Sequence, residues 1–517
     1  MQPFFVNSFP GNRVDDLRST ARRMPNRIRE DLMTPYRDSL HSETGPMQSP
    51  FHTAEHLYFL PVGGTAMATL AGLLKEQGHR VEGVDTRLYP PMSTLLEELG
   101  IPVRLGWKPE QIPEAARVII GNAVPRSNPE VQRVLSRRQP FLSQAEAVSH
   151  YLLAEGRESL VVAGTHGKTT TTSLLAWIFE ELGTDPTALV GGLLKWSRRS
   201  FRLGRGPWMI IEGDEYNTSF FDRGPKFLHY RARIFLLGPV EFDHADLYRD
   251  LDAVLTAFRA GTAQVPRHGT VIVNALSPAA LEGVRDTSAQ ILKVGATPDC
   301  ALRLGETVVE RDSGITRTSV DWQGRQLKLR LPMPGRHNAE NAAMALAGAL
   351  VAELDPDGIL DALSRFPGVA RRMDTIGEAS GILVVDDFAH HPTALVVTIA
   401  AARSRWPERR LVVAFEPRSL TAARREFQDR YVEALSEADV ALVAPPFHRG
   451  RIATEDCLDR DRMAFELQNR GVQALMPHED EDLVEALVPS LRPGDVVIGC
   501  SSGDFGAFHR RLLERLG

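Results

Sequence analysis

Cysteine is scarce in this sequence, and its scarcity excludes several classes of protein. Only three of the 517 residues are cysteine, namely Cys300, Cys457 and Cys500, and they lie far apart in the chain. Their spacing matches no Cys-rich metal motif and offers no disulfide framework. We therefore expect reduced thiols in a reducing compartment, for which the cytoplasm is the default.

Long apolar runs and an excess of positive charge are also missing. No apolar run approaches the roughly 20 residues that a membrane-spanning helix needs. Residues 1–7 lack the basic stretch and the long apolar core of a secretory signal. The 60 Lys and Arg residues are outnumbered by 66 Asp and Glu, which gives a net charge of −6. We expect neither a membrane anchor nor a nucleic-acid partner.

The sequence does contain a repeated alternation of short apolar runs with helical stretches. This alternation is typical of parallel sheets covered by helices, so we expect an α/β fold. The length suggests about three domains, and we place them at residues 56–155, 156–365 and 366–517. The polar residues 1–55 form an N-terminal extension, with one helix expected near 14–32. The expected strands are 57–62, 80–84, 118–123, 208–211, 234–237, 270–273, 382–385, 411–415, 440–443 and 496–498, and the clearest helices are 66–77, 391–405 and 424–434.

The stretch from Leu160 to Thr172 predicts a phosphate-binding loop. An apolar run ends at Gly164, and Gly167, Lys168 and Thr169 lead into an amphipathic helical pattern. Glycines let backbone N–H groups close around phosphate oxygens, a lysine reaches the outer phosphates, and the hydroxyl binds magnesium. The usual eight-residue pattern has Gly where this chain has Val162. The alternative is an ordinary turn with a surface lysine, and the helix pattern favours the nucleotide site.

Two acidic clusters follow expected strands. Glu212, Asp214 and Glu215 follow the strand at 208–211, and His244 lies among acidic residues after the strand at 234–237. Ligands in open α/β sheets bind at the carboxyl ends of strands, and carboxylate oxygens suit magnesium. A histidine there can complete a metal shell or orient a ligand. The alternative for each cluster is a solvated acidic loop.

Two weaker signals concern nucleotide recognition. Asn338 and Asn341 are three residues apart on an expected helix, so they share a face that could hydrogen-bond a purine. Composition alone favours a helix cap, with Asn338 as the N-cap. In the first domain Gly64 ends a partial glycine turn and Asp85 ends the second strand, where an acid often meets a ribose hydroxyl. A strand–helix–strand unit with no ligand is the alternative.

Taken in order, these motifs resemble the Mur ligase family of ATP-dependent amide-bond ligases of bacterial cell-wall synthesis. The resemblance covers nearly everything from residue 56 to the C-terminus. It implies a Rossmann-like first domain, a central P-loop ATPase domain and a Rossmann-like third domain. The motifs that carry it are Gly-Thr-His-Gly-Lys-Thr-Thr from Gly164, Glu-x-Asp-Glu from Glu212, Asp-His-Ala-Asp from Asp243, Gly-x-His-Asn-x-x-Asn from Gly335, Arg371-Arg372, and Asp-Asp-Phe-Ala-His-His-Pro-Thr from Asp386.

The resemblance implies roles at the matching positions. Lys168, Glu212 and His244 would be catalytic. Thr169 and Glu212 would bind one magnesium ion, and Glu212 and His244 a second. The residues expected to hold ATP are Gly164, Thr165, His166, Gly167, Lys168, Thr169, Thr170, Asn338, Asn341, Arg372 and Asp387.

The resemblance also implies the substrates. Gly64, Asp85, Ser93 and Thr94 would face UDP-N-acetylmuramate, while His390 and Arg418 would serve the amine substrate. A guanidinium matches a carboxylate in bidentate fashion, so Arg418 is expected to bind a peptide carboxylate. The stretches 89–94, 121–130, 219–230, 387–394 and 415–419 favour the tripeptide L-alanyl-γ-D-glutamyl-meso-diaminopimelate, in a reaction that recycles cell-wall peptide. The alternative amine is L-alanine, since the members that add it are the nearest competitor. They usually have Tyr-Gly where this chain has Phe388-Ala389, and Glu where it has Ala394.

The chain departs from the family pattern at a few positions. Pro61 replaces a glycine of the first turn, Gly238-Pro239 replaces Asn-Asn, and Asn217 replaces an aspartate. None of these positions is an expected ligand, so we expect the activity to persist. We expect the protein to be a monomer or a weak homodimer.

Two other classes of protein remain as alternatives. A nucleotide-dependent switch would leave the third domain without a role, and a nicotinamide dehydrogenase would need the complete glycine fingerprint that the first domain lacks.

Overall fold

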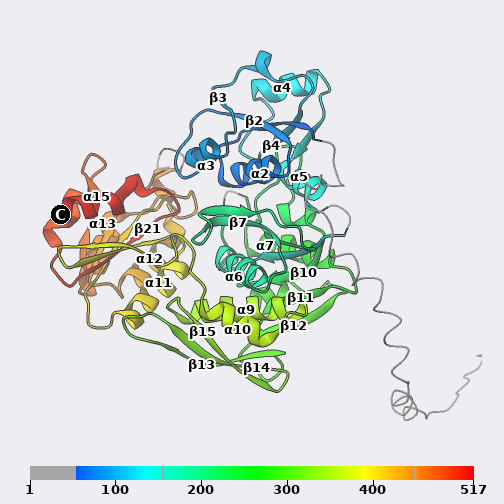
Figure 1. The fold of residues 1–517 in the computed structure, drawn as a ribbon. Helices are drawn as coiled ribbons and strands as arrows, with labels where there is room; N and C mark the ends of the chain where they lie inside the picture. Colours follow the sequence, from blue (N-terminus) through cyan, green and yellow to red (C-terminus); the bar gives the residue numbers. More distant parts are fainter. Residues whose placement is uncertain (1–53, 154–155, 246, 448–449, 451) are drawn as a thin grey trace, which may run out of the picture. The chain divides into compact units, whose positions relative to one another are not determined.

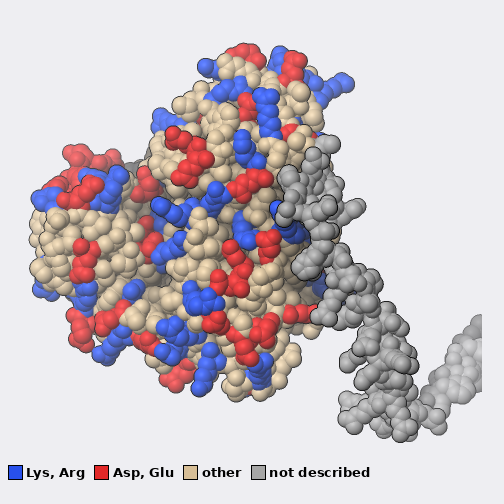
Figure 2. All heavy atoms as spheres, viewed as in Figure 1, with Lys and Arg blue, Asp and Glu red and all other residues tan. Residues whose placement is uncertain are grey.

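The computed structural model describes residues 54–153, 156–245, 247–447, 450 and 452–517. The extension and the helix expected near 14–32 lie outside the described residues. Residues 52–517 form a single unit by their contacts, and this unit contains three sheets. None of the helices in the described ranges is long and apolar enough to cross a membrane. Figure 2 shows acidic and basic side chains interspersed on one face.

The first sheet has five parallel strands in the order β3-β2-β1-β4-β5. Side chains of β1 point to opposite faces, and both faces are buried: Leu57 and Phe59 join one apolar cluster, Tyr58 and Leu60 another. A parallel sheet buried on both faces gives the continuous apolar runs seen in the sequence. Its elements are β1 (His56–Leu60), α2 (Thr65–Glu76), β2 (Arg80–Asp85), α3 (Met92–Glu98), β3 (Val103–Leu105), β4 (Arg117–Ile120), α4 (Pro129–Ser136), β5 (Phe141–Ser143) and α5 (Gln144–Tyr151).

The central sheet has ten strands in the order β15-β14-β13-β12-β11-β10-β6-β9-β7-β8. The run from β13 to β7 is parallel, whereas β8 at one edge and β14 and β15 at the other pair in antiparallel fashion. Helices α6, α9 and α10 lie together in Figure 1 and pack on one face. The elements are β6 (Glu158–Ala163), α6 (Lys168–Glu181), β7 (Thr187–Leu194), β8 (Arg199–Arg202), β9 (Trp208–Glu212), β10 (Ala232–Leu237), α7 (Leu251–Ala263), β11 (Thr270–Asn274), α8 (Pro278–Glu282), β12 (Gln290–Gly295), β13 (Leu302–Val309), β14 (Thr316–Trp322), β15 (Arg325–Leu331), α9 (Arg336–Val351) and α10 (Pro356–Ser364).

The third sheet has six strands in the order β16-β17-β21-β18-β19-β20, parallel except for the edge strand β16. Helices α11, α12 and α13 contribute to the apolar cluster on one face, and α14 and α15 to the cluster on the other. Its elements are β16 (Asp374–Ala379), β17 (Ile382–Asp387), α11 (Pro392–Arg405), β18 (Leu411–Phe415), α12 (Gln428–Leu435), β19 (Val440–Val443), α13 (Arg460–Asn469), β20 (Gln473–Leu475), α14 (Leu483–Leu487), β21 (Val496–Cys500) and α15 (Phe508–Leu516).

The α/β fold with largely parallel sheets is confirmed, and most expected strands agree within a few residues. The helix expected over 424–434 is wrong at its start, because a short 3₁₀ turn, Arg425–Phe427, precedes α12. The antiparallel strands β13 to β15 were not predicted. Their exposed face is polar, so they lack the apolar run by which the buried parallel strands were recognised. The domain limits at 155 and 365 stay a prediction.

Candidate active site

The phosphate loop of the central domain has the backbone that its sequence predicts. β6 ends at Ala163, and α6 begins at Lys168 with Gly167 as its N-cap. Gly164 and Gly167 have φ values of 126° and 79°, in the left-handed region that favours glycine. A Cβ at Gly164 would lie 3.0 Å from the Gly238 backbone, and one at Gly167 would overlap the side-chain oxygen of Asn341. No side chain caps α6, so its first N–H groups can receive an anion.

Lys168 lies at the start of α6 and pairs with Glu215. Its Nζ donates to the Gly164 carbonyl at 2.7 Å and lies 2.9 Å from Glu215 Oε2. The Glu215 side chain is 3% exposed and that of Lys168 is 15% exposed. Burial opposes the charged form of Lys168, but the attraction of Glu215 holds its pKa above the ordinary value. The lysine is therefore a fixed cation beside the loop.

Glu215 also pairs with His244, which joins three motifs in one network. His244 Nε2 lies 3.0 Å from Glu215 Oε1. Burial alone would lower the pKa of His244, yet its hydrogen bond to Glu215 and the carboxylate charge raise it. The loop before α6, the acidic stretch after β9 and the segment after β10 thus converge on one carboxylate. The sequence marked Glu215 only as one of three adjacent acids, and nothing in the pattern distinguished it.

Thr169 and Glu212 form a separate pair of oxygen donors. Thr169 Oγ1 donates to Glu212 Oε1 at 3.0 Å, and the Gly191 N–H donates to Oε2 at 2.7 Å. Burial raises the pKa of Glu212, against the opposing charge of Lys168. Asp214, between Glu212 and Glu215 in sequence, instead pairs with the buried Lys226 at 2.7 Å. The three adjacent acids therefore have three different partners.

Asn338 and Asn341 share one face of α9, as their spacing predicts. Asn341 Nδ2 donates to Asn338 Oδ1 at 3.4 Å, and Thr171 Oγ1 donates to Asn341 Oδ1 at 3.4 Å. The alternative that made Asn338 an N-cap is wrong, because α9 begins at Arg336 and Gly335 is its N-cap. Asn338 Nδ2 instead donates to the Pro334 carbonyl at 2.8 Å. Asn341 thus contacts α6, the helix that follows the predicted phosphate loop, whereas Asn338 contacts Asn341 and the segment before α9.

A cavity of about 630 Å³ brings together all the expected nucleotide residues except Gly164. This volume lies within the usual range for small-molecule sites. The third domain contributes to its wall at the carboxyl end of β17 and the start of α11. The expected residues that line it are Thr165, His166, Gly167, Lys168, Thr169, Thr170, Glu212, His244, Asn338, Asn341, Arg372, Asp387 and His390.

Known protein families match most of this chain. Three family models match consecutive parts of the chain: Mur ligase family, catalytic domain, at residues 56–155; Mur ligase middle domain at 162–349; and Mur ligase, glutamate ligase domain, at 371–503.

The chain belongs to the Mur ligase family.

Relatives and solved structures cover the chain almost completely. The UDP-N-acetylmuramate–L-alanyl-γ-D-glutamyl-meso-2,6-diaminoheptandioate ligase of Escherichia coli is 35% identical over 468 residues, 89% of this chain and 98% of that protein. A murein peptide ligase from Psychrobacter arcticus is 30% identical, with a TM-score of 0.68 over 90% of this chain and 99% of that one. A UDP-N-acetylmuramate–alanine ligase from Thermotoga maritima, 24% identical, shares the fold with a TM-score of 0.73 over 89% of this chain and 98% of that one. The chain is thus an ATP-dependent ligase with the three-domain Mur ligase fold.

Arg372 and Asp387 of this Mur ligase lie against the cavity but are held within the third domain. Asp387 accepts from the N–H groups of Met373 and Ala389 at 2.7 and 2.8 Å, and burial raises its pKa. The Arg372 guanidinium lies over the Phe388 ring, 4.9 Å from its centre. Burial lowers the pKa of Arg372. His390 Nδ1 lies 2.9 Å from the Phe388 carbonyl.

The other expected substrate residues do not line this cavity within the described part of the chain. Asp85 accepts from the Gly63 N–H at 2.8 Å and the Thr86 N–H at 2.7 Å, which fixes the turn after β1. Gly64 is exposed, and Ser93 and Thr94 lie on α3. Thr65 and Ala66, which follow Gly64, do reach the cavity. The sequence did not predict these two residues, because the glycines of the turn were its only recognisable signal.

Arg418 has acidic partners of its own. Its Nη1 lies 2.9 Å from Asp504 and 3.6 Å from Glu416, and its guanidinium covers the Phe447 ring at 4.2 Å.

The departure from the family pattern at Gly238-Pro239 lies against the phosphate loop. The Thr165 N–H donates to the Pro239 carbonyl at 2.8 Å. Pro239 therefore supports the loop through its carbonyl oxygen, a contact that does not need the N–H group that proline lacks.

Proposed function

We propose that this Mur ligase joins the tripeptide L-alanyl-γ-D-glutamyl-meso-diaminopimelate to UDP-N-acetylmuramate at the expense of ATP. The observation that carries the proposal is the extent of the likeness to the ligase of that name, 35% identity over 98% of its length. The cavity supports it, since the predicted phosphate loop, a largely buried lysine and paired oxygen donors line one space. The product would return peptide released from the cell wall to the precursor pool.

The nucleotide site is assigned to the central domain. We place the ATP phosphates on residues 164–170, because the N-terminus of α6 is uncapped and Lys168 is fixed beside it. Asn338 and Asn341 would serve the nucleotide from α9, and Arg372 and Asp387 would approach it from the third domain. Their positions along the cavity wall support this assignment.

The donor set near α6 fits magnesium. Thr169 and Glu212 place a hydroxyl and a carboxylate oxygen 3.0 Å apart, and both are hard oxygen donors. Burial raises the pKa of Glu212, so a bound dication would favour its ionised form. A magnesium ion held there supplies charge neutralisation to the phosphate oxygens. His244 stays the candidate for a second ion, with Glu215 orienting its ring.

The reaction follows from the substrates and these residues. The lactyl carboxylate of UDP-N-acetylmuramate attacks the γ-phosphorus of ATP, which yields an acyl phosphate and ADP. The tripeptide amine then attacks the acyl carbon, loses a proton and displaces phosphate, leaving an amide. Lys168 balances the charge of the phosphoryl group in transfer. The wall formed by Asp387, Phe388 and Ala389 would keep water from the acyl phosphate.

The decisive experiment measures ADP release from the purified full chain with UDP-N-acetylmuramate. The tripeptide and L-alanine are supplied separately at equal concentration, and a reaction without amine gives the background. The proposal expects faster release with the tripeptide. Faster turnover of L-alanine would instead support the alanine-adding alternative, and dependence on neither amine would contradict both.

Location and assembly are part of the same proposal. We place the enzyme in the cytoplasm because Cys300, Cys457 and Cys500 are all unpaired thiols. A monomer or weak homodimer is the expected assembly, and sedimentation velocity across a range of concentrations would test it. A tight oligomer at the lowest concentration would contradict that expectation.

A further inference from the structure

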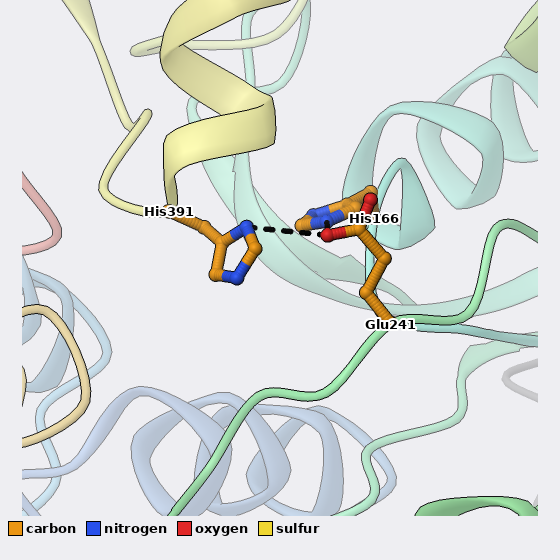
Figure 3. A group of neighbouring side chains, drawn as sticks. All are labelled: His166, Glu241 and His391. Carbon is orange, nitrogen blue, oxygen red and sulfur yellow. Dashed lines mark ion pairs between the residues drawn. The ribbon is translucent and has the colours of Figure 1, made fainter. Parts of the chain in front are cut away.

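Three side chains from three motifs converge beside the phosphate loop. His166 belongs to the loop itself, Glu241 follows β10, and His391 is the N-cap of α11. Glu241 Oε2 lies 3.7 Å from His166 Nε2 and 3.6 Å from His391 Nδ1. Figure 3 shows His391, at the start of α11, directed toward the Glu241 carboxylate, with the His166 ring beside that carboxylate. One ligand atom from each residue lies within 4.8 Å of the other two.

Three ring nitrogens in this cluster have no hydrogen-bond partner among the described residues. Neither ring nitrogen of His391 has a hydrogen-bond partner in the described part of the chain, nor has Nε2 of His166. His391 is only 2% exposed. A buried polar group without a partner costs free energy and calls for an explanation.

The spacing suits a tetrahedral metal site. Ligands at about 2.0–2.1 Å from a tetrahedral ion lie about 3.3–3.4 Å from one another. The two separations to Glu241, 3.6 and 3.7 Å, need only a small contraction to reach this geometry. The two imidazole nitrogens lie within 4.8 Å of each other and would have to move closer when the ion binds. Two imidazoles and one carboxylate form a known zinc ligand set that leaves a fourth position open.

The carboxylate is held in place by groups around it. Thr393 Oγ1 donates to both oxygens of Glu241, at 3.0 and 2.8 Å, and Arg430 Nη2 donates to Oε2 at 3.2 Å. Arg430 is a cation, but its side chain is 48% exposed and solvated. Partners that orient a ligating carboxylate are a regular feature of metal sites.

We propose that His166, Glu241 and His391 bind one transition-metal dication, with Zn²⁺ as the ion that suits the ligand set. The site differs from the predicted magnesium site, where Thr169 and Glu212 offer only oxygen. Because His166 lies in the phosphate loop and His391 in the third domain, the ion would tie that domain to the loop. Its occupancy would therefore change how freely the third domain moves over bound nucleotide.

Cobalt is the probe for this site, because tetrahedral Co²⁺ absorbs visible light and Zn²⁺ displaces it. The full chain is stripped with a chelator and titrated with Co²⁺ in excess Mg²⁺, which occupies oxygen sites. We expect one tetrahedral Co²⁺ per chain, displaced by Zn²⁺. His391→Gln should weaken binding by at least about 10- to 100-fold, the loss that follows removal of even an indirect partner of a ligand.

A matched control separates this site from histidines in general. His229 pairs with Asp222 at 2.7 Å and lies outside the cluster, so His229→Gln should bind Co²⁺ like wild type. If the circular dichroism spectrum shows that His391→Gln does not fold, His166→Gln provides the same comparison. Absence of a tetrahedral spectrum in wild type, or unchanged affinity in a folded His391→Gln or His166→Gln, would overturn the proposal. No substrate is present, so this result is independent of the proposed ligase activity.

Discussion

The two sides of the cavity differ in where their polar groups find partners. On the central-domain side, Lys168, Glu215 and His244 come from three separate motifs and contact one another. On the third-domain side, Asp387 accepts from backbone N–H groups of its own domain. Likewise Arg371 pairs with the neighbouring Asp386 at 3.2 Å.

The central-domain side is therefore stabilised by contacts between distant segments, and the segment around Asp387 by contacts within its own domain. The central side depends on the convergence of strand ends, so one substitution there affects several groups at once. On the third-domain side, His391 and Thr393 contact Glu241 of the central domain, but the segment around Asp387 is braced locally, so a substitution in that segment should affect one contact. Four substitutions distinguish these two arrangements, and the strongest losses are expected on the central side.

Glu215→Gln should give the largest loss of stability, because it leaves the charged Lys168, whose side chain is only 15% exposed, without its partner. Breaking a buried ion pair by removing one member costs about 3–5 kcal/mol. Urea unfolding of the full chain measures the change in the free energy of unfolding. Glu282→Gln is the control, since Glu282 pairs with Arg285 at the surface and is 49% exposed, where such pairs are worth about 0–1 kcal/mol. If both variants lower the free energy of unfolding equally, Lys168, Glu215 and His244 do not stabilise the fold as one network.

Lys168→Ala should have the largest effect on turnover. The phosphoryl group in transfer would lose its nearest fixed cation, which costs roughly 2.7–4 kcal/mol, or a factor of about 10²–10³ in kcat. Lys195→Ala removes an ion pair with Asp374, 2.6 Å long, from a lysine that does not line the cavity. It should keep most of the activity. A Lys168→Ala enzyme within threefold of wild type would refute the assignment of the phosphate site.

The sequence predicted the central side well, for identifiable reasons. A phosphate loop needs left-handed glycines, a lysine and hydroxyls within a few residues, so one local pattern specifies Gly164 through Thr169. The parallel strands were also predictable, because burial on both faces leaves continuous apolar runs. In the structure each of these features lies where the pattern places it.

Contacts between distant segments were much harder to predict. Glu212, Asp214 and Glu215 are chemically alike and adjacent, and only the packed structure decides that Glu215 meets Lys168 while Asp214 meets Lys226. The cluster of His166, Glu241 and His391 unites residues from three parts of the chain. No local spacing rule connects them, because the fold alone brings the third domain to the loop.

Glu212→Gln should raise the magnesium requirement, and Asp214→Asn should do so less. Glu212 is the acid that Thr169 contacts, whereas Asp214 is engaged by Lys226. We expect the half-saturating Mg²⁺ concentration to rise by about 10- to 100-fold for Glu212→Gln, the range seen when metal sites lose a supporting partner. Initial rates at saturating ATP across a Mg²⁺ series measure it. If the two variants shift the curve equally and little, the acidic stretch acts only as a solvated loop.

Arg418→Ala tests the third domain away from the cavity wall, and of the four changes it should have the smallest effect on the ATP site. The guanidinium is braced by Asp504 and Phe447 rather than by the central network, so its loss should leave the ATP site intact. A hydrogen bond between charged groups is worth about 1.5–3 kcal/mol, which corresponds to a rise of at least about tenfold in the KM for the tripeptide. The KM for ATP should stay near its wild-type value. Arg403→Ala, which removes a surface pair with Asp439 in the same domain, is the matched control and should change neither constant. If Arg418→Ala raises both KM values together, the third-domain side is coupled to the phosphate network, and the contrast between the two sides does not hold.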